Sequence, residues 1–170
     1  GVVYIDCSQH STETQVTSAI GRGLNEESET GFSIPRVGLS RAHYYDYLWD
    51  TLDELYDSAI IILDEIDQLV DDEDGEAGVL MQLTRAKESG KINTDVGVVA
   101  VSNKINYRKS LNERVKSSLG DDELVFSPYD GDQLQSIMQA RTDAFRDGAL
   151  DSGVIPKTAA LAAREHGDAR

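Results

Sequence analysis

Two adjacent carboxylates, Asp64 and Glu65, directly follow a run of four apolar residues at positions 60–63. Such a run is typical of a strand in a parallel sheet that is buried on both faces. Ligands bind at the carboxyl ends of strands in open α/β sheets, where one carboxylate can hold Mg²⁺ and the next can orient or deprotonate an attacking water. The pattern favours a nucleotide-hydrolysing site over a core strand that runs into a solvated acidic turn.

The segments around these carboxylates must supply the sheet that positions them. Three further runs rich in branched or aromatic residues are predicted as strands: residues 2–7, 96–102 and 124–126. Apolar residues at helical spacing fill the intervals between the runs, which is typical of a parallel α/β sheet covered by helices. We expect the strand at 60–63 to lie between the strands that begin near Val2 and Val98.

Residues that suit helix N-caps mark the starts of the predicted helices. Ser11 or Thr12 is expected to cap a first helix, and Ser40 a long amphipathic helix whose aromatic stripe packs in the core. Asp130, with Gln133 three residues later, forms a variant of the capping box and predicts another helix from that point.

The composition describes an acidic chain that is able to fold. Its net charge is −15 and its pI about 4.4 over 170 residues, but 39% of the residues are apolar, which argues against disorder. Ten arginines stand against six lysines. The acidic residues are spread along the chain, so adaptation to high salt is favoured over a surface that repels nucleic acid or attracts a basic partner.

The cysteine content and the chain ends indicate a cytoplasmic piece of a larger protein. Cys7 is the only cysteine, so an intrachain disulfide is excluded and a reducing compartment fits best. No apolar run approaches the roughly 20 residues of a membrane span, and we expect no membrane partner. The sequence does not begin with methionine, and it ends inside a helical pattern.

Several short motifs, taken in order, resemble the AAA+ replication initiators of archaea, which are relatives of the eukaryotic origin-recognition complex and the cell-division-control helicase loader. The motifs lie at residues 60–69, 99–103, 111–120, 125–134 and 167–170. Each is short, but the ordered set covers nearly the whole chain. The first contains four apolar residues followed by Asp-Glu, the Walker B pattern of that family.

The resemblance implies a role for five residues and two cofactors, ATP and Mg²⁺. Asp64 would coordinate Mg²⁺, and Glu65 would activate the water that attacks the γ-phosphate. Asn103 is similar to sensor 1, and Arg170 to the sensor 2 arginine that reaches the phosphates from the lid. Arg114 is similar to the box VII arginine, a candidate finger for a neighbouring subunit's nucleotide.

The sequence departs from the family pattern in two ways. Clamp-loader and eukaryotic relatives carry arginine where this chain has Ser118, and no Gly-x-x-x-x-Gly-Lys-[Ser/Thr] phosphate loop occurs. In the family the phosphate-loop strand precedes the position where this sequence starts, and a winged-helix domain would follow its end. The implied fold is therefore a partial three-layer αβα AAA+ core over residues 1–128, followed by the start of an α-helical lid domain over 129–170.

The resemblance also implies the partners of the full-length protein. These are origin DNA, the replicative helicase and, through the ATP site, other initiator subunits at the nucleoid. An initiator-specific element that contacts DNA is expected at residues 31–41, with Arg36 and Arg41. Two alternatives stay open: another AAA+ ATPase, such as a clamp loader or remodeller, and a scaffold that has the fold without binding nucleotide.

Overall fold

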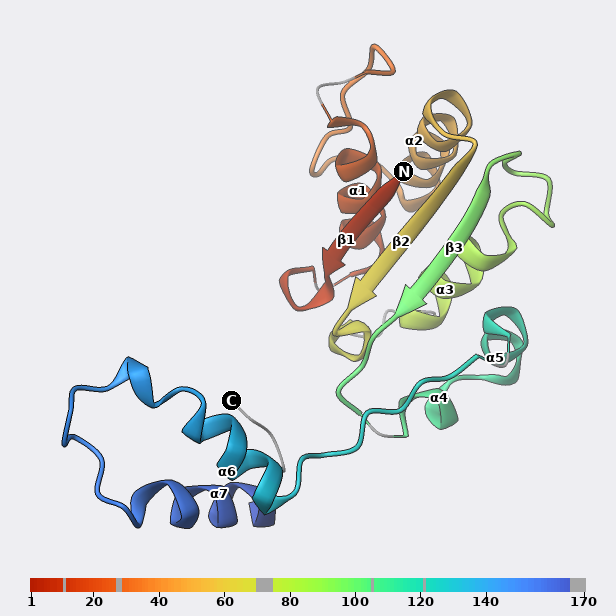
Figure 1. The fold of residues 1–170 in the computed structure, drawn as a ribbon. Coiled ribbons are helices and arrows are strands. Elements are labelled where there is room, and N and C mark those ends of the chain that lie inside the picture. The colour runs from red at the N-terminus through yellow and green to blue at the C-terminus, as the bar shows by residue number, and fades with distance from the viewer. Residues whose placement is uncertain (11, 27–28, 70–74, 105, 121, 166–170) are drawn as a thin grey trace. The chain divides into compact units, whose positions relative to one another are not determined.

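Three parallel strands form the sheet that carries the predicted carboxylates. The computed structural model describes residues 1–170 except 11, 27–28, 70–74, 105, 121 and 166–170. Strand β1 spans Val2–Asp6, β2 Ser58–Asp64 and β3 Asp95–Ala100, and both neighbouring pairs are parallel in the order β1-β2-β3. Figure 1 shows β2 between the other two strands. The predicted parallel sheet and the central place of this strand are confirmed.

Helices pack on one face of the sheet. Helix α1 (Glu13–Leu24) contacts β1, α3 (Gly75–Arg85) contacts β3, and α2 (Arg41–Leu55) packs against α1. Successive side chains of a strand point to opposite faces. Those that point toward the helices are at most 7% exposed: Val3, Ile5, Ala59, Ile61 and Leu63. They form the core together with the aromatic stripe of α2, in which Tyr45 stacks on Trp49 as the predicted packing requires.

The opposite face of the sheet is open to solvent in the described part of the chain. Val2 is 69% exposed, Tyr4 59%, Ile60 46% and Val99 47%. The expectation that residues 60–63 are buried on both faces is therefore wrong in this structure, because the described helices that contact the sheet lie on its other side. A third layer is not formed by the residues that the structure describes.

Short helical turns follow the carboxyl ends of the three strands. The 3-10 turn η1 (Cys7–Gln9) follows β1 and η3 (Ile66–Gln68) follows β2, while α4 (Tyr107–Ser110) and α5 (Glu113–Leu119) come after β3. The hydroxyl of Thr12 caps α1 and that of Ser40 caps α2, as predicted. Within the described ranges, no helix combines the length and the apolar character that a bilayer crossing requires.

The chain divides into two compact units, Gly1–Glu123 and Leu124–Arg170. In the second unit, α6 (Gly131–Gln139) packs against α7 (Val154–Glu165), and the 3-10 turn η4 (Thr142–Ala144) lies between them in sequence. The capping box of Asp130 and Gln133 is present as predicted. The division lies close to the expected boundary between residues 128 and 129, and the assignment of a core and a lid to the two sides stays a prediction.

The strand expected at residues 124–126 does not form. Leu124 is 80% exposed, Val125 59% and Phe126 84%. A strand is stabilised by hydrogen bonds to a neighbouring strand, and among the described residues none lies alongside this segment. Its apolar composition alone therefore does not make it part of the sheet.

Candidate active site

Polar side chains at the ends of β1 and β2, and in the segment after β3, lie at the carboxyl edge of the sheet. Asp6 and Asp64 are register partners at the ends of β1 and β2, and Glu65 follows at once. Beyond the end of β3, the amide of Val101 still donates to the carbonyl of Leu63, at 2.8 Å. This extension of the sheet places Asn103, two residues later, near the same edge. The sequence-predicted pair Asp64–Glu65 and Asn103 are thus brought together.

Both carboxylate oxygens of Asp64 accept hydrogen bonds. Oδ2 accepts from the hydroxyl of Tyr4 at 2.5 Å, and Oδ1 accepts from the backbone amide of Glu65 at 2.8 Å. Tyr4 pairs in register with Ile62, two residues before Asp64, so Tyr4 and Asp64 project from the same open face of the sheet. The hydrogen bond to Asp64 raises the pKa of Tyr4 to about 12, so the phenol is a donor at neutral pH.

Glu65 has a left-handed backbone conformation, with φ 50° and ψ 40°. The turn that it makes is held beside β3, because the amide of Ile66 donates to the carbonyl of Val101 at 3.1 Å. As a result the Glu65 carboxylate faces Asn103, whose Nδ2 lies 3.5 Å from Glu65 Oε1. This distance is at the long end for a hydrogen bond, as is common in catalytic sites without substrate.

A buried carboxylate fixes the segments on either side of this contact. The side chain of Asp67 is 3% exposed and accepts from Ser102 Oγ at 2.7 Å, and Lys104 Nζ lies 3.6 Å from its second oxygen. Ser102 and Lys104 are the two neighbours of Asn103 in sequence. Asp67 therefore fixes the position of Asn103 relative to Glu65, a role that the sequence alone did not indicate.

Two other titratable groups at this edge are unsuited to catalysis. Asp6 accepts hydrogen bonds from the side chains of Ser8 and Gln9, which lower its pKa and keep it a bound carboxylate. Cys7 is fully buried, and burial, followed by the charges of Asp6 and Asp64, raises its pKa to about 12. Its thiol is protonated at neutral pH and is not a nucleophile.

The donor set suits a hard cation held by few protein ligands. In the part of the chain that the structure describes, no three His, Cys, Asp or Glu side chains converge as a complete metal site. Mg²⁺ is usually held in proteins by one or two carboxylates, with water and phosphate oxygens completing its shell. Asp64 at the sheet edge meets that requirement.

The predicted arginines fall in three different situations. Arg114 is exposed on α5, which Asn112 caps and the buried Val115 anchors. Arg170 lies outside the described residues. In the segment expected to contact DNA, the structure has a loop before α2 begins at Arg41, and Arg41 Nη1 donates to Glu13 Oε2 at 2.9 Å. Arg36 in that loop is exposed.

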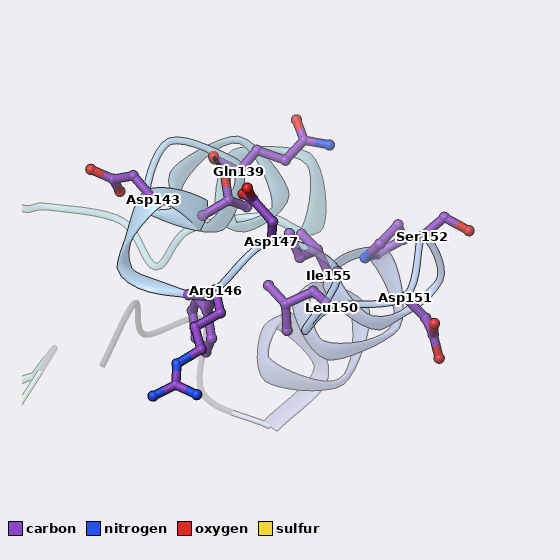
Figure 2. A pocket seen from close by; sticks show the side chains of 12 residues that line it. Gln139, Asp143, Arg146, Asp147, Leu150, Asp151, Ser152 and Ile155 are labelled. Carbon is purple, nitrogen blue, oxygen red and sulfur yellow. Dashed lines mark hydrogen bonds between the residues drawn. The ribbon is translucent and has the colours of Figure 1, made fainter.

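A surface hollow in the second unit contains none of the described site residues. It measures about 710 Å³ and is lined by the end of α6, the start of α7 and the segment between them. In Figure 2 the side chains of Asp143, Asp151 and Arg146 point outward, and Leu150 and Ile155 lie between the helices. Asp147 also lines the hollow, so three aspartates face a single arginine there. The hollow therefore does not suit a phosphate group.

Comparisons with known proteins give the same family for both units. The family model described as the Cdc6 AAA+ ATPase-type lid domain matches residues 135–170. ORC1-type DNA replication protein 4 of Halobacterium salinarum is 56% identical over 170 residues, which are 100% of this chain and 40% of that protein. The ORC1-type DNA replication protein of Thermococcus onnurineus is 41% identical, over 99% of this chain and 40% of its own length. The chain thus spans about 40% of the length of these curated relatives.

Solved structures agree in fold. The Aeropyrum pernix ORC1 protein, determined in complex with DNA, is 38% identical with a TM-score of 0.79, over 99% of this chain and 41% of that one. The Pyrobaculum aerophilum Cdc6p structure, at 24% identity, has a TM-score of 0.70 over 93% of this chain and 39% of that one, and shows the fold alone.

Proposed function

We propose, from the premise that this chain belongs to the archaeal Orc1/Cdc6 family of AAA+ proteins, that it carries the hydrolytic half of an ATP site in a DNA replication initiator. The observation that supports this most directly is that Asp64, Glu65 and Asn103 lie together at one edge of a parallel sheet. The full-length protein would bind origin DNA at the chromosome, hydrolyse ATP and help to load the replicative helicase.

Each of the described site residues has a task that its surroundings support. Asp64 would hold Mg²⁺, which supplies charge neutralisation of the phosphates when it is bound. Glu65, whose carboxylate faces Asn103, would accept the proton of the attacking water. Asn103 would orient that water or a phosphate oxygen. Arg114, exposed on α5, would reach the nucleotide of a neighbouring subunit, and Arg170 would act from the lid.

DNA contact by the loop before α2 is part of the same proposal. The relative from Aeropyrum pernix was determined in complex with DNA. In this chain Arg36 is exposed on that loop, whereas Arg41 is paired with the buried Glu13. Arg36 is therefore the better placed of the two arginines to meet a DNA phosphate.

The test of the ATP site is Glu65→Gln in the full-length protein. The amide keeps the size of the side chain and removes the base, so we expect ATP affinity within about threefold of the wild type and turnover reduced by about a hundredfold or more. Binding is measured by calorimetric titration with ATP and Mg²⁺, and turnover by phosphate release.

Glu88→Gln is the matched control, because Glu88 is 77% exposed and its contact with Arg85 is 4.0 Å long. It should change neither measurement. If affinity and turnover fell together in Glu65→Gln, Glu65 would be a structural or metal-binding residue. A wild-type protein that neither binds nor hydrolyses ATP would point to the scaffold alternative.

A further inference from the structure

Asp67 is a buried carboxylate that contacts the residues on both sides of Asn103. Its side chain is 3% exposed, and it lies in η3, the turn that begins directly after Glu65. Oδ1 accepts from Ser102 Oγ at 2.7 Å, and Oδ2 lies 3.6 Å from Lys104 Nζ. The same ammonium group donates to the backbone carbonyl of Asp67 at 3.3 Å. One residue therefore connects the turn of Glu65 with the segment of Asn103 through three contacts.

The turn that carries Asp67 is itself fixed in the first unit. The side chain of Ile66, the residue before it, is fully buried. The amide of Gln68 donates to the carbonyl of Glu65 at 2.9 Å, and the amide of Ile66 donates to the carbonyl of Val101 at 3.1 Å. Asp67 is thus a fixed point to which the segment after β3 is bound.

Asn103 depends on such a contact because it lies beyond the end of the strand. Strand β3 ends at Ala100, and Asn103 is exposed in a bend three residues later. A side chain on a loop is positioned less precisely than one on a strand unless other contacts fix it. The hydroxyl of Ser102, which donates to Asp67, also accepts from the amide of Lys104 at 3.0 Å. These two hydrogen bonds fix the backbone that flanks Asn103.

Stability alone does not explain a carboxylate at position 67. Burying a charge costs desolvation energy, and a buried ion pair is often no more stabilising than apolar residues of the same size. Lys104 is 65% exposed, so solvent screens its attraction for Asp67. What a carboxylate supplies, and an apolar residue does not, is a defined position for one hydroxyl and one ammonium group.

We propose that Asp67 is a positioning residue for ATP hydrolysis, which acts by holding Asn103 at a set distance from Glu65. The inference rests on the proposed function, in which Glu65 accepts a proton from the attacking water and Asn103 orients that water. Groups that act on one reacting molecule must be held within about 0.5 Å of the productive geometry. Asn103 Nδ2 lies 3.5 Å from Glu65 Oε1, and without Asp67 this distance is no longer set.

Asp67→Ala in the full-length protein separates this role from a structural one. We expect turnover, measured by phosphate release, to fall about tenfold to a hundredfold. Calorimetric titration should give an ATP affinity, with Mg²⁺, within about threefold of the wild type, because Asn103 is needed to orient the water rather than to bind the nucleotide.

Asp53→Ala is the matched control for the loss of a hydrogen-bonded carboxylate. Asp53 accepts from the backbone amides of Asn93 at 2.8 Å and Thr94 at 3.0 Å, just before β3 begins and at the end of the strand opposite to the site. Both variants should melt at a lower temperature than the wild type, and only Asp67→Ala should lose turnover. Equal turnover in the two variants would overturn the proposal.

An Asn103→Ala background shows whether Asp67 acts through Asn103. Asn103→Ala alone should lower turnover by about tenfold or more. Adding Asp67→Ala should then cause less than about a twofold further loss, because the side chain that it positions is already gone. A further tenfold loss would mean that Asp67 acts on another group, and the proposal would be wrong.

Ser102→Ala removes the shorter contact and leaves the charge of Asp67 beside Lys104. Turnover should fall about threefold to tenfold with ATP affinity unchanged, and the combination with Asp67→Ala should be no worse than Asp67→Ala alone. Normal turnover in Ser102→Ala and Asp67→Ala, with Asn103→Ala impaired, would overturn this inference and leave the proposed function intact. A wild type that hydrolyses no ATP would overturn the proposed function, and this inference with it.

Discussion

Tyr4 is a candidate positioning residue for the proposed magnesium ligand. Its hydroxyl donates to Asp64 Oδ2, and the amide of Glu65 donates to the other oxygen, so the carboxylate is held from two sides. The pKa of Tyr4 is raised from its ordinary value of 10.0 to about 12. Because this pKa is raised, the stabilisation from the hydrogen bond between Tyr4 and Asp64 is fully present below about pH 10. It is lost as the pH rises through about 12. Its contribution is therefore constant across the physiological range.

Replacing Tyr4 by Phe in the full-length protein should weaken the effect of Mg²⁺ on ATP binding. The ring remains and the hydrogen bond is lost, so Asp64 is oriented less well. We expect ATP affinity without Mg²⁺ to stay the same, and its enhancement by Mg²⁺ to fall about threefold to tenfold. Titration of a fluorescent ATP analogue with and without Mg²⁺ measures both quantities.

Tyr47→Phe is the control for this experiment, because the ring of Tyr47 lies on α2 against Phe32, with centroids 5.2 Å apart. It should have no effect on the Mg²⁺ dependence. Equal behaviour of the two variants would show that the hydroxyl of Tyr4 does not orient the metal ligand.

Between elements, a buried carboxylate joins the two main helices of the first unit. Glu13, 3% exposed at the start of α1, accepts from Arg41 Nη1 at 2.9 Å and from the hydroxyl of Tyr45 at 2.6 Å, both on α2. A Cβ on Gly78 of α3 would lie 2.8 Å from Glu13 Oε2, so the third helix also packs closely against this carboxylate. Glu13 thus links all three helices that cover the sheet.

Glu13→Ala should lower the free energy of unfolding by about 2–4 kcal/mol, because the buried hydroxyl of Tyr45 loses its acceptor. Urea unfolding of the 170-residue chain in high salt measures this free energy. The signal is the fluorescence of Trp49, the single tryptophan, which stacks on Tyr45. Glu88→Ala, at an exposed position, should cost less than about 0.5 kcal/mol. Similar losses in the two variants would mean that Glu13 does not link the helices.

The sequence predicted those elements whose signals are local. Thr12, Ser40 and Asp130 cap helices within a few residues of themselves, and four apolar residues define β2 wherever it lies in the sheet. The prediction of a strand at residues 124–126 was wrong, because a strand forms only beside a neighbouring strand, which a local sequence pattern does not reveal. For the same reason the sequence did not show that one face of the sheet is open.

The site was predictable to the same extent. Asp64, Glu65 and Asn103 were predicted as site residues because they follow apolar strands and match the family motifs, and the parallel pairing places them together. Tyr4 and Asp67 were missed, because their contacts join residues 60 and 35 positions apart. The only available signal was the register: Tyr4 falls on the same face as Asp64 once β1 and β2 are paired.

For the whole molecule, the charge makes stability depend on salt. Fifteen net negative charges repel one another over about 10 Å at 0.1 M salt, and over about 3 Å at 1 M. Part of this repulsion is visible on α2, where Asp46, Asp50 and Glu54 are exposed and four residues apart. We expect the melting temperature of the chain to rise by several degrees between about 0.1 M and about 2 M KCl.

Asp50→Lys tests this explanation, because it places a positive charge between Asp46 and Glu54. The variant should melt at a higher temperature than the wild type in low salt, and the difference should shrink as KCl is added. Differential scanning calorimetry at several salt concentrations measures both effects. A gain of the same size at every salt concentration would mean that screening is not the cause.

The backbone of Glu65 makes this residue a point where activity and stability compete. A left-handed conformation disfavours a residue with a Cβ by about 1–2 kcal/mol relative to glycine, and Glu65 is the only described residue other than glycine with positive φ. Glu65→Gly should therefore be as stable as the wild type or more stable by up to about 1 kcal/mol, and it should hydrolyse no ATP. A selection for thermal resistance alone would thus tend to replace Glu65, and only a requirement for turnover would retain it.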